Sequence, residues 1–156
     1  MDTLENDTAR PGTLAELLSY LAVAPLLLCL ACLLLPAGYS THELAQRGAI
    51  AWGAVLLAAT GAVHWGLALA GRLPASALRT AVSALPTVVA TAAVLIGGQH
   101  GLALLIVGSG LFWLYEHRAL GAQLPPAYLG LRRNLSVAVC SLLALMVIAT
   151  DAAELL

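Results

Sequence analysis

The apolar run from Ala49 to Gly71 constrains the fold of this chain more than any other feature. A helix needs about 20 apolar residues to cross the roughly 30 Å hydrocarbon core of a bilayer, and this run is long enough. Its centre, residues 61–66, reads Gly-Ala-Val-His-Trp-Gly, which places an imidazole and an indole inside the apolar stretch. Small and polar residues recur at helical spacing, at Gly53, Thr60, Gly61, His64, Ala68 and Gly71. The run therefore predicts a transmembrane helix with one face suited to a close helix neighbour.

The rest of the chain repeats this pattern of apolar runs and short connections. Of its 156 residues, 61% are hydrophobic and 10% are charged, against roughly a quarter charged in soluble domains. We predict an all-α fold, a polytopic membrane helix bundle with five transmembrane helices. The predicted segments are a polar N-terminal tail (1–13), helices at about 14–35, 49–71, 80–97, 101–119 and 132–150, and a short acidic tail (151–156). In an alternative arrangement, the third and fourth runs form a hairpin that does not cross the bilayer, because the turn between them is short.

A proline interrupts the first of these runs. Pro25 lies near its middle, where it removes one amide donor and displaces the carbonyl four residues earlier, that of Leu21. Proline is one of the few causes of a sharp helix bend. We therefore predict a kink between Leu21 and Pro25.

The charges indicate an orientation and argue against one class of partner. A net charge of −1 leaves no basic patch for nucleic acid. All basic residues are arginines, which is typical of a GC-rich bacterial genome. With the N-terminus inside, only Arg47 faces outward, whereas the cytoplasmic side receives Arg10, Arg72, Arg79, Arg118, Arg132 and Arg133. By the positive-inside rule, we predict a bacterial inner-membrane protein with a cytoplasmic N-terminus and a periplasmic C-terminus.

The residues that could carry chemistry are few. Cys29, Cys32 and Cys140 all lie inside apolar runs, where we interpret them as packing residues rather than as disulfide, redox or metal-binding groups. No serine or cysteine lies in a recognisable nucleophile motif, and no carboxylates have metal-ligand spacing. We therefore predict neither an enzyme nor a cofactor or metal site.

The polar residues within the spans are predicted to gather at one depth. In the proposed topology His64 and the carbonyl freed by Pro25 both lie a few ångströms to the cytoplasmic side of the midplane, and polar groups in hydrocarbon need partners. We expect His64 to point to Tyr20 or to the Leu21 carbonyl, and Glu116 to meet an arginine between Arg118 and Arg133. The predicted buried polar layer comprises Tyr20, His64, Trp65, Trp113, Glu116, Arg118 and Arg132.

Several of these residues also resemble a family pattern. Trp52-Gly53, followed by His64-Trp65-Gly66 in the second span, and the segment Leu-Pro-Pro-Ala-Tyr-Leu-Gly-Leu-Arg at 124–132 are similar to the transmembrane protein sixty-nine family. The resemblance extends from about Leu14 to Ala149. That family consists of small five-span proteins of bacteria and mitochondria with a domain of unknown function. The resemblance implies a multi-pass inner-membrane protein and supplies no reaction.

Three classes of function remain. The first, which the sequence favours, is an accessory, assembly or interaction protein whose partners are the lipid bilayer and other inner-membrane proteins. The second is a small proton-coupled transporter that uses His64 and Glu116, the ionisable pair within the spans. The third is a redox protein, either quinone-linked or with His64 and His117 as ligands of a b-type haem.

The arginine distribution leads to a test of topology. A reporter fused after Leu156 is expected to be active outside the cytoplasm, and one fused after Gly121 inside it. These two activities follow from an odd number of crossings with the arginine-rich connections held in the cytoplasm. A C-terminal reporter that is active in the cytoplasm would mean that one of the five runs does not cross.

Overall fold

The computed structural model describes residues 13–35, 38–71, 76–121, 124 and 126–154, and in this part of the chain the regular structure is entirely helical. The all-α prediction is confirmed. Of the polar tail predicted at residues 1–13, residues 1–12 lie outside the described residues, as does Arg72, and Thr13 is the first residue of α1. The helices are α1 (Thr13–Leu21), α2 (Ala24–Leu34), α3 (Tyr39–Leu69), α4 (Ala77–Ile96), α5 (Gly98–Leu120) and α6 (Pro126–Glu154).

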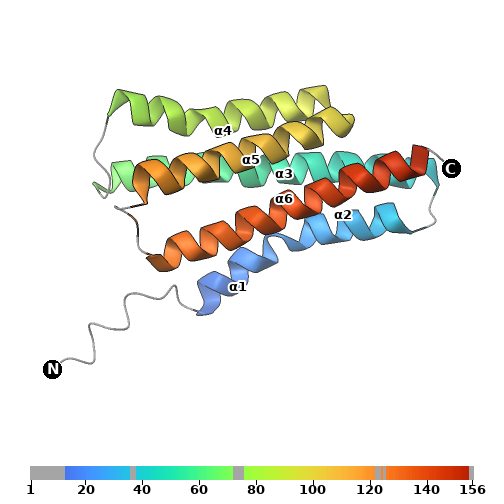
Figure 1. Cartoon of the computed structure of the whole chain (residues 1–156), viewed down its shortest axis with the longest axis horizontal. Helices are drawn as coiled ribbons and strands as arrows, with labels where there is room; N and C mark the ends of the chain where they lie inside the picture. Colours follow the sequence, from blue (N-terminus) through green and yellow to red (C-terminus); the bar gives the residue numbers. More distant parts are fainter. Residues whose placement is uncertain (1–12, 36–37, 72–75, 122–123, 125, 155–156) are drawn as a thin grey trace.

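Helix α3 is the centre of the bundle. It packs against α2, α4, α5 and α6, whereas α5 also pairs with α4 and α6, and α2 pairs with α6. Figure 1 shows the helices lying side by side, with α1 at one end of the bundle and the last turn of α6 at the other. The run that dominates the sequence is therefore the helix around which the others assemble.

The helices have the length and the surface of membrane spans. Four segments are long and apolar enough to cross a bilayer: Glu16–Leu34, which combines α1 and α2, then Tyr39–Leu69, Ala77–Ile96 and Pro126–Asp151. Helix α5, with 23 residues, is about 35 Å long but carries more polar side chains. In Figure 1 it lies along the other helices from one end of the bundle to the other. Large apolar side chains cover the outside, among them Leu28, Leu69 and Leu95.

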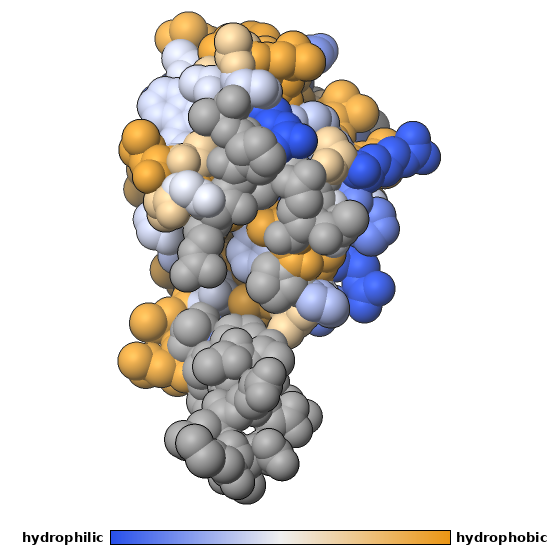
Figure 2. All heavy atoms as spheres, turned by 90° about the vertical axis from the view of Figure 1, so that its left-hand side faces the viewer, coloured by the Kyte–Doolittle hydropathy of each residue, from blue (hydrophilic) through white to orange (hydrophobic). Residues whose placement is uncertain are grey.

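One end of the bundle has a different surface. Figure 2 views the end at which α5 finishes and α6 begins, and shows hydrophilic side chains gathered there beside apolar flanks. His117 and Arg118 in the last turns of α5, and Arg133 near the start of α6, are exposed at this end. We call it the arginine end. It matches the polar boundary expected where helices leave the hydrocarbon.

Helices α3 and α6 extend well beyond the spans that the sequence predicted. Helix α3 begins at Tyr39, so the connection expected before Ala49 is helical, and the 31-residue helix is about 46 Å long. Glu43 and Arg47, one turn apart and 2.6 Å from each other, stabilise this extension. Helix α6 begins at Pro126, since the fixed φ of proline suits the first helical position. It also continues through Asp151, into the predicted acidic tail.

The turn between α4 and α5 is tighter than predicted. Only Gly97 separates the last residue of α4 from Gly98, the first residue of α5, and both glycines have positive φ, whereas the predicted helices left residues 98–100 between them. A positive φ is a conformation that glycine adopts at little cost. Close to this turn, Gln99 donates a hydrogen bond to Asp151 of α6, which fastens α5 to the end of the chain's last helix.

The first span is broken where Pro25 predicts a bend. Helix α1 ends at Leu21 and α2 starts at Ala24. The amide of Leu26 donates to the carbonyl of Val23 rather than to the carbonyl of Ala22, which lies four residues earlier. The carbonyl of Ala22 is then available, and the indole of Trp52 donates to it at 2.8 Å. The sequence pointed instead to the Leu21 carbonyl and to His64 as its partner. A tryptophan of α3 therefore stabilises the break.

Glycine allows α3 and α4 to touch through their backbones. A Cβ atom at Gly61 would collide with the carbonyl oxygen of Ser83 and would lie 3.5 Å from Pro86. The small stripe of α3 therefore has a close neighbour, as the sequence predicted. Gly66, one turn further along the same helix, has open space at the corresponding position.

These two glycines make a matched pair of variants. Gly61→Ala is expected to lower the free energy of unfolding by about 1–3 kcal/mol, because the backbones must separate. Gly66→Ala is expected to leave it unchanged or to raise it, since alanine is the better helix former. Thermal unfolding of both variants in the same mild detergent measures the difference. Equal midpoints for the two variants would show that the α3–α4 contact does not limit stability.

Candidate functional site

A buried carboxylate lies where α3, α5 and α6 meet near the arginine end. Glu116 of α5 is 1% exposed, although its neighbours His117 and Arg118 face outward. One carboxylate oxygen, Oε2, accepts a hydrogen bond of 3.0 Å from Nε of Arg132, and the other, Oε1, accepts one of 3.1 Å from the hydroxyl of Tyr128. Both partners come from the first turns of α6. The helical start of α6 at Pro126 is what brings them over Glu116.

The burial of this carboxylate requires an opposite charge. An isolated ion is very costly to remove from water, and within a membrane ionisable side chains pair with one another. The side chain of Arg132 is 19% exposed, so the pair is screened little by solvent. Removing one partner of such a pair destabilises a protein strongly, because the other charge stays buried. The pair therefore locks α5 to α6.

A histidine of α3 faces the same carboxylate. His64 is 7% exposed, its Nδ1 lies 2.9 Å from the carbonyl oxygen of Thr60, and the ring of Phe112 covers it edge-on. Its Nε2 lies 3.7 Å from Oε1 of Glu116 and has no hydrogen-bond partner among the described residues. A carbonyl only accepts, so the hydrogen bond assigns the proton of the neutral ring to Nδ1. Nε2 then presents a lone pair to a carboxylate oxygen.

This arrangement of two acceptors can hold one proton. Without this proton, the lone pair of Nε2 and the oxygen Oε1 are two acceptors that face each other and cannot form a hydrogen bond. With it, the imidazole becomes a cation beside a carboxylate, and the two opposite charges attract each other. We call His64, Glu116, Tyr128 and Arg132 the ionic cluster. Its chemistry is that of a buried proton acceptor.

The cluster contains part of the predicted polar layer. Of the seven residues predicted, the structure brings together His64, Glu116 and Arg132. Trp113 is partly buried and stacks on the ring of His117 at 5.6 Å. The other three lie at the outer surface: Tyr20 and Trp65, each 49% exposed, and Arg118. His64 bonds to its own helix rather than to Tyr20 or to the Leu21 carbonyl.

Tyr128 was missing from that prediction. The sequence placed it in a connection between two spans, so its register on a helix could not be used. The pair proposed as haem ligands is not brought together either, because His64 is buried and faces Glu116 while His117 is exposed and lies against Trp113. Among the described residues no three histidine, cysteine, aspartate or glutamate side chains form a group that could hold a metal ion. Cys29 packs at Gly48 of α3.

A cavity of about 210 Å³ lies next to the cluster, between the break of the first span, α3, α5 and α6. Tyr128 and Arg132 line it, as do the hydroxyl side chains of Ser19, Thr60, Ser109 and Ser136, and its other walls are apolar. Drug-sized ligands occupy roughly 300–1,000 Å³. This cavity therefore suits a small solute and is too small for a haem.

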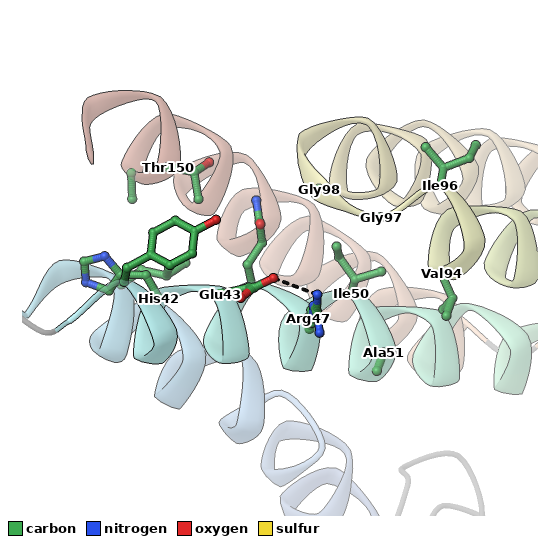
Figure 3. Close-up of a pocket in the computed structure, with 14 residues that line it drawn as sticks. His42, Glu43, Arg47, Ile50, Ala51, Val94, Ile96, Gly97, Gly98 and Thr150 are labelled. Atoms are coloured by element: carbon green, nitrogen blue, oxygen red, sulfur yellow. Dashed lines mark hydrogen bonds and ion pairs between the residues drawn. The ribbon is translucent and has the colours of Figure 1, made fainter. Parts of the chain in front are cut away.

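A second, larger cavity of about 860 Å³ lies at the opposite end of the bundle. Figure 3 shows His42, Glu43 and Arg47 of α3 around it, opposite Gly97 and Thr150. Between the two cavities the core is apolar, with five nearly or fully buried side chains: Leu57, Leu102, Leu105, Leu143 and Met146. This apolar layer separates the large cavity from the ionic cluster.

Fold and site together define a polytopic helical membrane protein with an ionic cluster buried near one end. The sequence model of a family described as protein of unknown function (DUF3429) matches residues 11–148. The chain belongs to this family, and the matched region includes every member of the ionic cluster. No curated protein and no solved structure matches the chain.

The pairing of Glu116 with Arg132 can be tested with a double-mutant cycle. Glu116→Leu and Arg132→Leu are each expected to lower the free energy of unfolding by about 3–5 kcal/mol, since each leaves a buried charge without its partner. The double variant is expected to lose less than either single variant. Thermal or denaturant unfolding in mild detergent gives the four stabilities.

Arg133→Leu is the control for this cycle, because it removes an exposed arginine from the next position of the same helix. Its stability is expected to stay close to that of the natural chain. Additive losses for the two cluster variants would contradict the pairing.

Proposed function

We propose that this protein is a small proton-coupled carrier and that the His64–Glu116 pair binds the coupling proton. One observation carries the proposal: the buried Nε2 of His64 lies 3.7 Å from Oε1 of Glu116, and no hydrogen-bond partner for it occurs in the part of the chain that the structure describes. Buried ionisable pairs in membrane proteins mark proton relays and solute pathways. Arg132 and Tyr128 keep the carboxylate of Glu116 in position when the proton binds and when it is released.

The two cavities support a carrier rather than a channel. A carrier exposes its site to one side of the membrane at a time. The ionic cluster borders a small cavity at the arginine end, the large cavity opens at the other end, and the apolar layer separates them. For the ionic cluster to become accessible from the end with the large cavity, the side chains of the apolar layer must therefore rearrange. The break between α1 and α2, which lines the small cavity, is the point where the first span can bend.

The arginine end is proposed to face the cytoplasm of a bacterium. Of the described arginines, Arg79, Arg118, Arg132 and Arg133 lie near this end, whereas Arg47 lies near the other. This bias supports a cytoplasmic N-terminus and an inner-membrane location. The resemblance to the transmembrane protein sixty-nine family supports the same kind of membrane. Because the cluster contains no serine or cysteine, a transport role suits it better than nucleophilic catalysis.

A second candidate is the accessory or interaction role in the inner membrane. The outer face of α3 carries an exposed stripe of small residues, Ala59, Ala62 and Gly66, which Ala70 continues directly after the helix. Such stripes allow another helix to approach closely within a membrane. A larger protein that co-purifies in mild detergent, and that Ala62→Leu releases, would favour this role over the carrier.

The carrier can be tested in proteoliposomes that contain a pH-sensitive dye. External solutes are added one at a time, from a panel of monocarboxylates, phosphate, amino acids, sugars and small cations. At least one of them is expected to acidify the interior with the natural chain, and Glu116→Gln and His64→Gln are expected to abolish this acidification. His117→Gln is the control, because it removes an exposed imidazole from the residue next to Glu116. A panel without any acidification would overturn the proposal.

A further inference from the structure

We propose that the 210 Å³ cavity binds a small oxyanion, a carboxylate or phosphate group held by Arg132, and that this anion is bound together with the proton at His64 and Glu116. The inference rests on the proposed carrier function and adds the chemical class of its substrate. It starts from the charge of the cavity wall. Arg132 is the one charged side chain among the described residues that line the cavity. A cation would be repelled there, whereas an anion would be attracted.

Arg132 has hydrogen-bond donors left for a ligand. A guanidinium group carries five N–H donors in a planar fork. The Nε–H of Arg132 donates to Glu116, and the two terminal nitrogens donate no hydrogen bond to another described residue. This side chain is partly exposed and lines the cavity. Arginine suits planar or tetrahedral oxyanions because two of its donors can bind two oxygens at once.

The other walls fit a small anion with a short apolar part. Ser109 of α5 and Ser136 of α6 line the same cavity, and neither hydroxyl makes a hydrogen bond with another described residue. Each can donate to an oxyanion. The other lining residues are mostly apolar and include Leu56, Leu57 and Val139. The volume limits the ligand to a small acid or to the headgroup phosphate of a lipid.

The charges of the cluster explain why the anion needs a proton. Glu116 is faced by His64 from α3 and by Tyr128 and Arg132 from α6, while Phe112 of its own helix covers His64. With Glu116 ionised and His64 neutral, the charges of Glu116 and Arg132 cancel. An added anion then leaves one uncompensated negative charge in a medium of low polarity, which is unfavourable. A proton taken from water onto Nε2 of His64 restores neutrality.

The anion and the proton therefore bind as a neutral set of charges. The loaded state contains two cations, His64 and Arg132, and two anions, Glu116 and the ligand. The empty state contains the Glu116–Arg132 pair alone. The loaded and the empty state are both neutral. The protein can therefore change its packing in either state without moving net charge through the hydrocarbon. One proton for each anion is the expected stoichiometry.

Calorimetry on the full chain in neutral detergent tests both parts of this inference. The probes are acetate, butyrate and inorganic phosphate, with glycerol and choline as neutral and cationic solutes. At mildly alkaline pH at least one anion is expected to bind, and neither glycerol nor choline. Titrations in two buffers with different heats of ionisation give the number of protons taken up, expected to be about one. Bilayer discs with phosphatidylglycerol or with phosphatidylcholine show whether a lipid phosphate fills the site.

Variants of α6 locate the site. Arg132→Gln is expected to weaken anion binding roughly tenfold or more, from the loss of a charged donor, whereas Arg133→Gln on the outside of the same helix is expected to leave it unchanged. Ser136→Val, which narrows the cavity without touching the cluster, is expected to weaken binding too. This second variant keeps the test decisive if Arg132→Gln does not fold.

The outcomes separate the inference from the function on which it rests. Binding of free anions in phosphatidylcholine discs supports a solute site, and loss of that binding only in phosphatidylglycerol supports a lipid phosphate in the same place. An anion that binds at Arg132 without proton uptake overturns the coupling and the carrier function with it. No anion binding, while a neutral or cationic solute acidifies proteoliposomes, overturns the oxyanion site and leaves the carrier function standing.

Discussion

The charge of Glu116 is the constraint on which the arrangement of this bundle depends. A carboxylate that is 1% exposed within a membrane protein must have its charge compensated. Arg132 supplies the opposite charge, and Tyr128 donates a second hydrogen bond. Both side chains reach Glu116 because α6 begins at Pro126, so that Tyr128 and Arg132 lie on helical turns that pack against α5. The pairing thus fixes the register of α6 on α5. It also fixes the position of the carboxylate that His64 faces.

Close backbone contact provides the other half of the architecture. Helix α3 approaches α4 at Gly61, and its Trp52 donates to the carbonyl that the break of the first span frees. In a membrane the lipid tails are as apolar as the core, so such close packing and hydrogen bonds replace the hydrophobic effect as the force between helices. With both contacts made by α3, His64 is held on a rigid helix opposite Glu116.

Much of the fold follows from the sequence, because a spanning helix leaves a strong signal. The apolar runs, the break at Pro25 and the small stripe around Gly61 all give the right elements in the right order. The ends of the helices do not follow, since Tyr39–Gly48 and Pro126–Leu131 are polar or contain proline and were interpreted as connections. For the site, depth along the helices brings His64, Glu116 and Arg132 to one level. Depth alone gives no rotation about a helix axis, which is why Tyr20, Trp65 and Arg118 were included although they face outward.

Nitrogen-15 NMR of histidine-labelled protein tests the central claim, that one proton is shared at His64 and Glu116, most directly. The signal of His64 is assigned by its absence in His64→Gln. The structure implies that the neutral ring carries its proton on Nδ1, because that atom donates to Thr60, and that the added proton lies on Nε2 facing Glu116, so that Glu116→Gln is expected to change the chemical shift of Nε2. A ring that carries its neutral proton on Nε2, or an Nε2 signal that Glu116→Gln leaves unchanged, would contradict the account.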